Sequence, residues 1–410
     1  MPEPVAWKFK KVLKPIIELE AEHAILKGRV LTCVGDEVIE DGFVEIEGGK
    51  ITRVGKQSEM GNIDGIKVYE VPGGTVMPGM MNTHAHLAWD GIHDLADQSM
   101  NDSPELAAYK SCANMLLSLR SGITTVFDLG VNKCNITTKE AVEHGIFPGP
   151  RVLISGEAII QTGGHTYWAC REASGADEMR RAIRNQVKSG ADIIKIHTCH
   201  DRLEFMDEEL HAVIDEAHRN GLPVTAHATF DECINRCARF GVDSIEHAGN
   251  MSDETIQLLL ENNIPITTTF SAVVLQSQPE IARKYNIPEW KIQERQRQAA
   301  DKAKYADIVK AAKAGVMICF GTDAGSPCVQ HNMIAPEMEF MVKLGVVDGN
   351  YGVLRTATIN AAKKIGLEKK LGTLEVGKLA DVIMMEGNPV EDIYALTKVK
   401  YTFKEGMQML

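Results

Sequence analysis

The middle of the chain alternates between two hydrophobic patterns. Short apolar runs rich in β-branched residues, typical of buried strands, are separated by segments in which apolar positions recur at helical spacing. Segment 207–218 is one of these, because Leu210, Val213 and Ile214 fall on one face of a helix. The eight apolar runs cover residues 74–81, 123–128, 151–159, 191–197, 222–228, 242–247, 264–270 and 316–321.

This alternation predicts an α/β protein whose strands are joined by helices. Eight strand–helix units within about 250 residues are typical of a (β/α)8 TIM barrel, in which functional residues lie at the carboxyl ends of the strands. Glycine follows several of the helical segments, as expected where a helix ends. These glycines are Gly122, Gly190, Gly221, Gly241 and Gly315.

The two flanks of the chain follow a different pattern, in which apolar and polar residues alternate. Residues 24–72 and 374–404 both show this alternation, interrupted by turn signals, and therefore predict short strands. The simplest arrangement is one small β-sandwich domain built from both chain ends, with the barrel inserted between them. We expect residues 1–73 and 370–410 to form the β-sandwich and residues 74–369 to form the barrel.

Composition and charge exclude several classes of protein. The 410 residues are 44% hydrophobic and 24% charged, as in ordinary soluble globular proteins. No apolar stretch approaches the roughly 18 residues that suggest a membrane span. The net charge of −12 disfavours binding to nucleic acid. We therefore expect neither a nucleic acid nor a membrane as a partner.

The cysteines and the amino-terminal segment indicate the cellular compartment. Nine cysteines are scattered along the chain without a CxxC motif, which favours reduced thiols. Residues 1–14 contain basic residues but no apolar block of the kind found in secretory signals. We expect a cytoplasmic protein, and we also expect it to form a homo-oligomer.

Ionisable residues gather at the ends of the predicted strands. His84 and His86 end the first run and project to the same side of a strand, although two polar residues at a strand end would explain them equally well. Four further residues end the fourth, fifth, sixth and eighth runs: Lys195, His227, His247 and Asp323. Because the strand ends of a barrel surround one point, these six residues predict a metal site.

Lys195 is the unusual member of this set. A free lysine ammonium, with a pKa of about 10.4, cannot coordinate a cation. Reaction of the amine with carbon dioxide would give an anionic carbamate that two cations can share. The alternative is a structural lysine paired with Asp323 or Glu246.

The six residues resemble the ligand set of the amidohydrolase superfamily, specifically of its binuclear members with a carboxylated lysine. Residues 77–84 and 371–383 also resemble segments of that superfamily, and the resemblance extends over roughly residues 24–405. It implies a (β/α)8 barrel that carries a β-sandwich and holds two divalent metal ions. Imidazole ligands favour zinc, and leave manganese, iron and cobalt open.

The resemblance also implies a role for each ligand. One ion would be bound by His84, His86 and Asp323 and the other by His227 and His247, with N6-carboxylysine at Lys195 shared between them. A hydroxide that bridges the two ions would attack the substrate. Asp323 would be the catalytic base, which takes the proton of the attacking water and returns it to the leaving nitrogen.

A loop after the third run points to the substrate. Its Gly-Gly-His sequence, residues 163–165, and the following Arg171-Glu172 pair resemble the prolidase-like dipeptidase branch of the superfamily, which includes N-acyl amino acid hydrolases. The resemblance gives His165 a catalytic contact with the substrate carbonyl or oxyanion, with Tyr167 beside it in the substrate site. The alternative for His165 is an exposed turn residue.

The loop after the fourth run holds two further candidates for substrate binding. His200 and Arg202 could bind a substrate carboxylate, or could be solvated loop residues. This loop lacks the glycine-rich stretch common in the dipeptidase branch, so it leaves the exact substrate open.

We therefore expect a hydrolase that cleaves the amide bond of a small molecule, either a dipeptide or an N-acyl amino acid. A cyclic-amide hydrolase or deaminase of the same superfamily is the alternative. Deaminases of this fold usually need no lysine ligand and carry a glutamate shortly after the fifth-strand histidine, whereas His227 is followed by Ala-Thr-Phe-Asp. A non-enzymatic relative is the third hypothesis, and the presence of all six ligands disfavours it.

Overall fold

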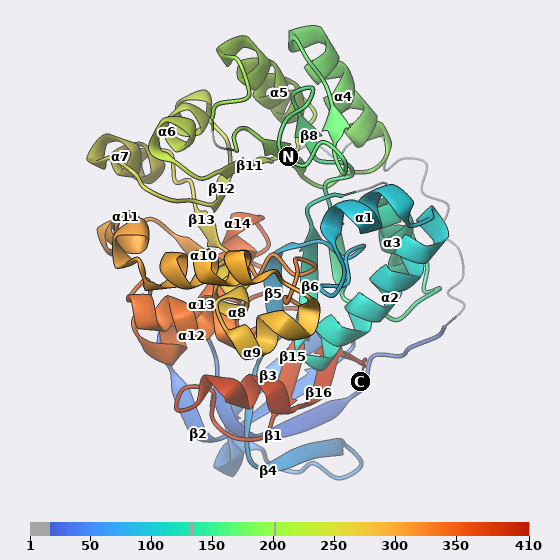
Figure 1. The fold of residues 1–410 in the computed structure, drawn as a ribbon. Helices are drawn as coiled ribbons and strands as arrows, with labels where there is room; N and C mark the ends of the chain where they lie inside the picture. Colours follow the sequence, from blue (N-terminus) through green and yellow to red (C-terminus); the bar gives the residue numbers. More distant parts are fainter. Residues whose placement is uncertain (1–16, 132–133, 201, 410) are drawn as a thin grey trace.

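The computed structural model describes residues 17–131, 134–200 and 202–409. A barrel surrounded by helices occupies most of the molecule, and a β-domain covers one side of it (Figure 1). Residues 1–14, for which the sequence predicts no secretory signal, lie outside the described residues. None of the helices in the described part of the chain is both long and apolar enough to cross a membrane.

Eight parallel strands form the barrel wall. They are β5 (Met80–Ala85), β6 (Ile123–Asp128), β7 (Arg151–Ile154), β10 (Ile194–His197), β11 (Val224–Ala228), β12 (Ser244–His247), β13 (Ile266–Thr268) and β14 (Ile318–Phe320). Neighbouring strands pair in parallel from β5 to β7 and from β10 to β14. A parallel bridge between Ala85 and Ala324 joins β14 to β5, and the Asp192 amide donates to the Ile154 carbonyl at 2.8 Å beside β7. The predicted barrel is confirmed.

Helices surround the barrel (Figure 1). They are α1 (Leu95–Asn101), α2 (Pro104–Arg120), α3 (Cys134–Glu143), α4 (Ala176–Lys188), α5 (Asp207–Arg219), α6 (Asp231–Phe240), α7 (Asp253–Glu261), α8 (Ser271–Gln276), α9 (Pro279–Ala282), α10 (Glu289–Ala300), α11 (Lys302–Ala314), α12 (Ala335–Leu344), α13 (Gly349–Thr356) and α14 (Ile359–Lys364). Helix α2 begins at a serine cap, where the Ser103 side chain accepts from the Leu106 amide. Helix α6 ends at Gly241, whose φ of 87° lies in the left-handed region that glycine tolerates.

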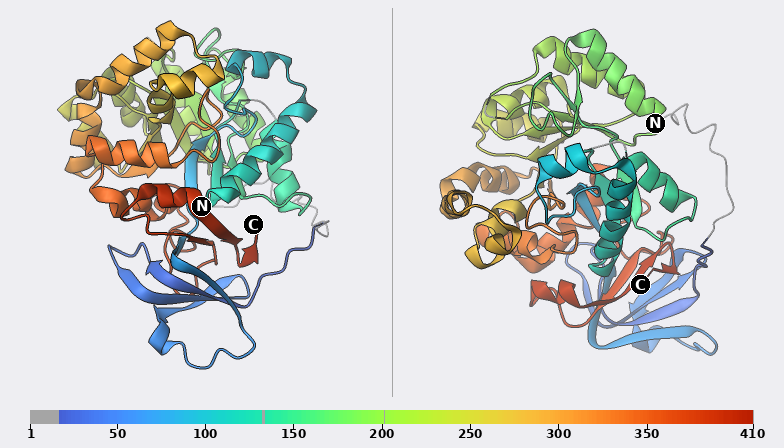
Figure 2. Two further views of the ribbon diagram at one scale, coloured as in Figure 1. Left: turned by 60° about the horizontal axis from the view of Figure 1, so that its bottom comes forward. Right: turned by 45° about the vertical axis from the view of Figure 1, so that its right-hand side comes forward.

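The β-domain is a seven-stranded sheet made from both ends of the chain, as predicted. Its strands, in spatial order, are β17 (Met407–Gln408), β16 (Val399–Lys404), β15 (Val382–Met385), β4 (Lys67–Pro78), β1 (Ala24–Leu31), β2 (Val38–Glu47) and β3 (Lys50–Lys56). Figure 2 shows the strands of both ends together on one side of the barrel. Val44, Val76, Val382 and Phe403 are among the buried residues of its core.

Two of the predicted barrel strands differ from the observed ones. The first run, residues 74–81, is divided, since β4 pairs with β1 and β15 in the β-domain and the barrel strand β5 continues to Ala85. The third run, residues 151–159, breaks after Ile154, and the short strand β8 (Ile159–Ile160) pairs with β10 and with β9 (Arg171–Glu172). Gly156 lies at this break with a φ of 68°, which turns the chain out of the strand.

Candidate active site

The structure brings the six predicted ligands together. All six line one cavity of about 320 Å³ at the carboxyl ends of the barrel strands: His84, His86, Lys195, His227, His247 and Asp323. His84 and His86 lie at the end of β5, and Asp323 follows β14. The chain after β14 pairs with the end of β5, and this contact closes the barrel. Barrel closure therefore explains why residues about 240 positions apart meet.

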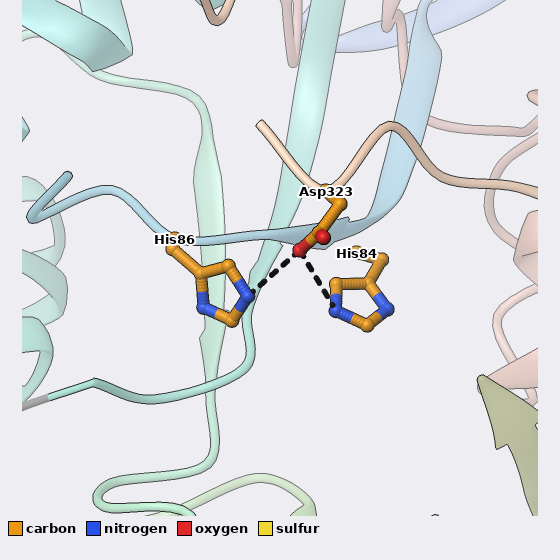
Figure 3. Close-up of side chains that lie close together, drawn as sticks. All are labelled: His84, His86 and Asp323. Atoms are coloured by element: carbon orange, nitrogen blue, oxygen red, sulfur yellow. Dashed lines mark hydrogen bonds and ion pairs between the residues drawn. The ribbon is translucent and has the colours of Figure 1, made fainter. Parts of the chain in front are cut away.

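Three of these side chains form a group that could hold a metal ion (Figure 3). The Oδ1 atom of Asp323 lies 3.0 Å from Nε2 of His86 and 3.4 Å from Nε2 of His84. One ligand atom from each of the three residues lies within 4.8 Å of the others. The remaining two histidines are adjacent, because the ring of His247 has its centroid 4.7 Å from that of His84 and 4.5 Å from that of His227.

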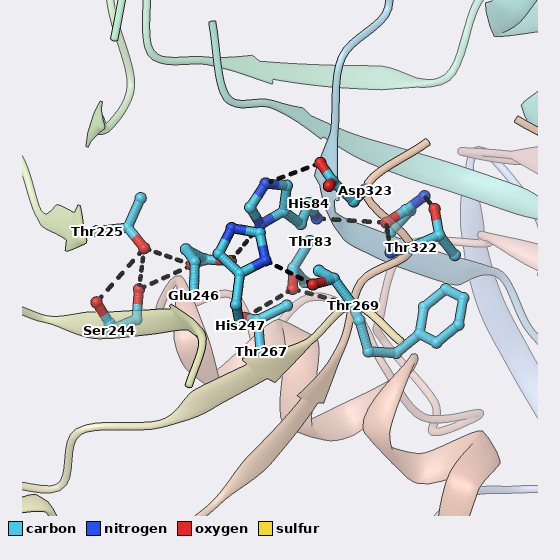
Figure 4. Close-up of polar contacts among 12 residues, drawn as sticks. Thr83, His84, Thr225, Ser244, Glu246, His247, Thr267, Thr269, Thr322 and Asp323 are labelled. Carbon is cyan, nitrogen blue, oxygen red and sulfur yellow. Dashed lines mark hydrogen bonds and ion pairs between the residues drawn. The ribbon is translucent and has the colours of Figure 1, made fainter. Parts of the chain in front are cut away.

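Hydrogen bonds behind the histidines fix the orientation of their rings. Nδ1 of His86 donates to the Gly130 carbonyl at 2.9 Å. Nδ1 of His84 lies 2.7 Å from the Glu246 carboxylate, and Nδ1 of His247 lies 2.6 Å from the Thr269 hydroxyl (Figure 4). Engaging Nδ1 leaves Nε2 to face the cavity, as is usual for histidines that bind metals. The donor set and its outer hydrogen bonds therefore fit a metal site.

Glu246 anchors a fully buried ionic network beneath His84. Its carboxylate accepts from the Lys364 ammonium at 2.7 Å, and from the Thr225 hydroxyl. Burial raises the pKa of Glu246, but the Lys364 and His84 charges outweigh burial and hold this pKa well below its usual range. The sequence suggested Glu246 only as an alternative partner of Lys195, and Lys364 of helix α14 takes that place.

Lys195 points into the site with no hydrogen-bond partner for its amine among the described residues. The side chain is 1% exposed, and burial lowers the pKa of the amine to about 8. Burying an amine without a hydrogen-bond partner costs free energy. A further group that binds or modifies the Lys195 amine would remove this cost. The neutral amine is also the form that reacts with carbon dioxide.

The backbone is strained at two of the predicted ligands. His247 and Asp323 have φ angles of 70° and 55°, and Thr166, next to His165, has a φ of 59°. Side chains other than glycine seldom occupy this left-handed region, and such strain clusters at functional sites. Here it aims the side chains that follow the strand ends toward the common cavity.

The four predicted substrate-binding residues are placed differently from one another. His165 lines the cavity, and its ring stacks on His200 with a centroid distance of 4.7 Å. Burial, followed by the charge of His200, lowers the pKa of His165 to about 4. Tyr167 is 58% exposed, and Arg202 is also exposed. Among the described residues that line the cavity, neither Tyr167 nor Arg202 occurs.

Arg295 also lines the cavity, although the sequence did not indicate it as a site residue. It lies in helix α10, which follows β13 after two shorter helices, α8 and α9. Because such inserted helices are not part of the strand–helix repeat, their position over the barrel cannot be inferred from hydrophobic periodicity. Segment 289–300 is mostly polar, so its sequence does not distinguish a charged residue that lines a cavity from one on a solvent-exposed helix face.

Comparison with known proteins agrees with this geometry. The sequence profile of the Amidohydrolase family matches residues 75–409. Ochratoxinase from Aspergillus niger is 29% identical over 371 residues, which cover 79% of this chain and 73% of that protein. The crystal structure of a Xaa-Pro dipeptidase with bound methionine in the active site is similar with a TM-score of 0.83 and 29% identity, covering 94% of this chain and 99% of the other.

A prolidase complexed with N-methylphosphonate-L-proline is similar with a TM-score of 0.82 and 26% identity, covering 94% of this chain and 98% of the other. The family profile covers most of the chain, including the barrel and all six residues gathered in the cavity. On these grounds the chain belongs to the amidohydrolase family.

Proposed function

We propose that this amidohydrolase-family hydrolase uses two divalent metal ions to cleave the amide bond of a dipeptide or an N-acyl amino acid. The observation that carries the proposal is the convergence of six ligand-type residues on one cavity, with the buried Lys195 amine among them. The similarity to a Xaa-Pro dipeptidase and a prolidase supports the choice of substrate class.

The residues present fit two metal sites that share one ligand. His84, His86 and Asp323 would hold one ion and His227 and His247 the other, with carboxylated Lys195 between them. Imidazole ligands favour zinc. When bound, such a pair of ions supplies hydroxide at neutral pH and polarises the scissile carbonyl.

The side chains of the cavity would supply the remaining chemistry. Asp323, with a carboxylate that is 21% exposed, accepts the proton of the attacking water and returns it to the leaving nitrogen. Burial raises the pKa of Asp323, but the hydrogen bond from His86 and the charges of the surrounding histidines together hold this pKa well below its usual range, so the carboxylate is ionised at neutral pH. His165 faces the same cavity and would stabilise the developing oxyanion.

The test combines metal analysis with a substrate library. The zinc-reconstituted protein should hold two ions per chain and release amino acids from a set of N-acyl amino acids and dipeptides, and chelation should abolish the release. Retention of activity after complete chelation, or no hydrolysis of any library member, would contradict the proposal. Release of ammonia from amino-substituted heterocycles, without amide cleavage, would favour the deaminase alternative.

A further inference from the structure

Helices α8 and α10 form one wall of the active-site cavity, and Arg295 is the cation that they bring to it. The two helices pack side by side in Figure 1. Arg295 lines the cavity of the six ligands and also an adjoining cavity of about 280 Å³. His227, His247 and Asp323 line both cavities as well. The guanidinium therefore lies where a ligand in either cavity can reach it.

Neutral amides, and not carboxylates, hold the Arg295 side chain. Its Nε donates to Oε1 of Gln276 at 3.0 Å, and its Nη1 donates to Oε1 of Gln298 at 2.7 Å. Gln276 is itself buried and fixed, because its amide nitrogen donates to the Pro327 carbonyl at 2.9 Å. The guanidinium is thus held in place while its charge is not neutralised.

The acidic groups nearest to Arg295 are engaged elsewhere. Among the residues that the structure describes, no carboxylate forms an ion pair with it. Glu294, its neighbour on α10, pairs with Lys291 at 2.8 Å, and Asp323 faces His84 and His86.

Arg151 shows the usual alternative for an arginine removed from water. It pairs with Asp381 and Glu405, and these charges raise its pKa despite its burial. For Arg295, by contrast, burial lowers the pKa. The charges of Glu294, Tyr305 and Asp323 raise this pKa by less than burial lowers it. A partly buried cation without a counter-ion costs free energy, which a bound anion would recover.

We propose that Arg295 binds the carboxylate of the substrate, and that the adjoining cavity takes the side chain of the residue that carries this carboxylate. The planar guanidinium fork matches a carboxylate, and Phe270, Val273 and Ile308 give the adjoining cavity apolar walls. The inference rests on the proposed function, and it defines the substrate further. The amide cleaved is the one that precedes a free C-terminal residue with an apolar side chain.

The test uses two probes that resist hydrolysis and differ mainly in charge. These are 3-phenylpropionate and its uncharged methyl ketone, 4-phenylbutan-2-one. In calorimetric titrations the wild-type protein should bind the acid at least about tenfold more tightly than the ketone, the scale of a hydrogen bond to a charged group. Arg295→Met should abolish this preference and leave the affinity for the ketone unchanged.

A matched control lies two residues away on the same helix. Arg297 is exposed, so Arg297→Met should bind both probes as the wild type does. If Arg295→Met does not fold, as judged by circular dichroism, Arg295→Gln carries the same test with an uncharged polar side chain. Retention of the acid preference in either folded Arg295 variant, or its absence from the wild type, would overturn the proposal.

Kinetics with the amide library separate this inference from the proposed function. An increase in KM for N-acyl amino acids in Arg295→Met, with kcat changed little, is expected if Arg295 binds the carboxylate. Unchanged kcat/KM with active enzyme would overturn the carboxylate site and leave the proposed function intact. The opposite outcome is also distinguishable. If the protein binds the acid more tightly than the ketone only when Arg295 is present, but hydrolyses no library member, the carboxylate site is supported and the proposed function is overturned.

Discussion

Lys195 combines complete burial with an amine that has no partner among the described side chains. Lys195→Ala should remove at least one metal ion and reduce the activity by at least about 100-fold, since even the outer partners of metal ligands contribute about 10–100-fold. Acetate or propionate should restore part of the activity by replacing the lost carboxylate. Metal analysis and steady-state kinetics measure both effects.

The exposed Lys343 provides the control for this substitution, because it lies on helix α12 with a side chain that is 63% exposed. Lys343→Ala should keep the metal content and activity of the wild type. Full metal occupancy together with a wild-type rate in Lys195→Ala would exclude a carboxylated lysine from the site.

The proposed function gives Asp323 two roles, as a metal ligand and as a proton acceptor, and one substitution separates them. Asparagine keeps the shape and one oxygen ligand but cannot accept a proton. Asp323→Asn should therefore retain most of the metal and lose about 10²–10⁴-fold in kcat, the typical contribution of general acid–base catalysis. If the metal-replete variant stays within about tenfold of the wild type, another group carries the proton, with His165 the first to test.

The residues of the site differ in whether the sequence alone predicts them. The six strand-end residues could be found because a barrel repeats and its strand ends converge. Glu246 and Lys364 could not be paired from the sequence, since the contact depends on how α14 packs beneath the barrel. Arg295 could not be found for a similar reason, because its helix has no counterpart in the repeat.

Among the connections between barrel strands, the one at Gly130 supports the predicted ligand His86. Gly130 follows β6 with a φ of 74°, and its carbonyl accepts from His86. A Cβ at this position would lie 2.5 Å from the Gly156 carbonyl oxygen and 2.7 Å from the Ala158 nitrogen, both of them backbone atoms. Gly130→Ala should therefore destabilise the fold and weaken metal binding, as measured by denaturant unfolding and metal titration.

Gly190→Ala is the matched comparison for this prediction. Gly190 has a φ of 86° with open space where a Cβ would lie. Its substitution should cost only the left-handed strain of about 1–2 kcal/mol. Gly130→Ala should lower the free energy of unfolding by at least about 1 kcal/mol more than Gly190→Ala does, because overpacking costs at least that much. Equal losses in the two variants would show that the close contact contributes nothing.

The elements themselves were largely predictable, and the exceptions have physical causes. Segment 207–218 agrees with α5 within one residue, because its apolar face is continuous. The break in the third run depends on the left-handed turn at Gly156, and an apolar run does not reveal such a turn. The division of the first run at Gly79 depends on which sheet each half joins, and this is a tertiary contact.

At the scale of the whole molecule, Arg151 joins the barrel to the β-domain. It lies in β7 and pairs with Asp381, which is 3% exposed, and with Glu405 in the turn before β17. Arg151→Met should lower the free energy of unfolding by about 3–5 kcal/mol, because the buried Asp381 charge loses its partner. The double variant Arg151→Met/Asp381→Leu should recover part of this loss, as thermal unfolding can measure.

An exposed ion pair provides the reference for this prediction. Arg239 and Glu254 pair on the surface with side chains that are 58% and 65% exposed. Such pairs contribute about 1 kcal/mol or less, so Arg239→Met should leave Tm nearly unchanged. Similar effects of the two single variants would mean that the junction between the barrel and the β-domain is not held by this ion pair.

The shared sheet sets an order of events during protein synthesis. Strand β4 pairs with β15, which the ribosome makes about 300 residues later, and chains emerge at about 5–20 residues per second. Strands β1–β4 pair with one another, but the outer edge of β4 therefore has no partner until the whole barrel has been made and the last segment completes the sheet. A chain truncated after residue 370 should leave β1–β4 open to trypsin, whereas the full chain protects them.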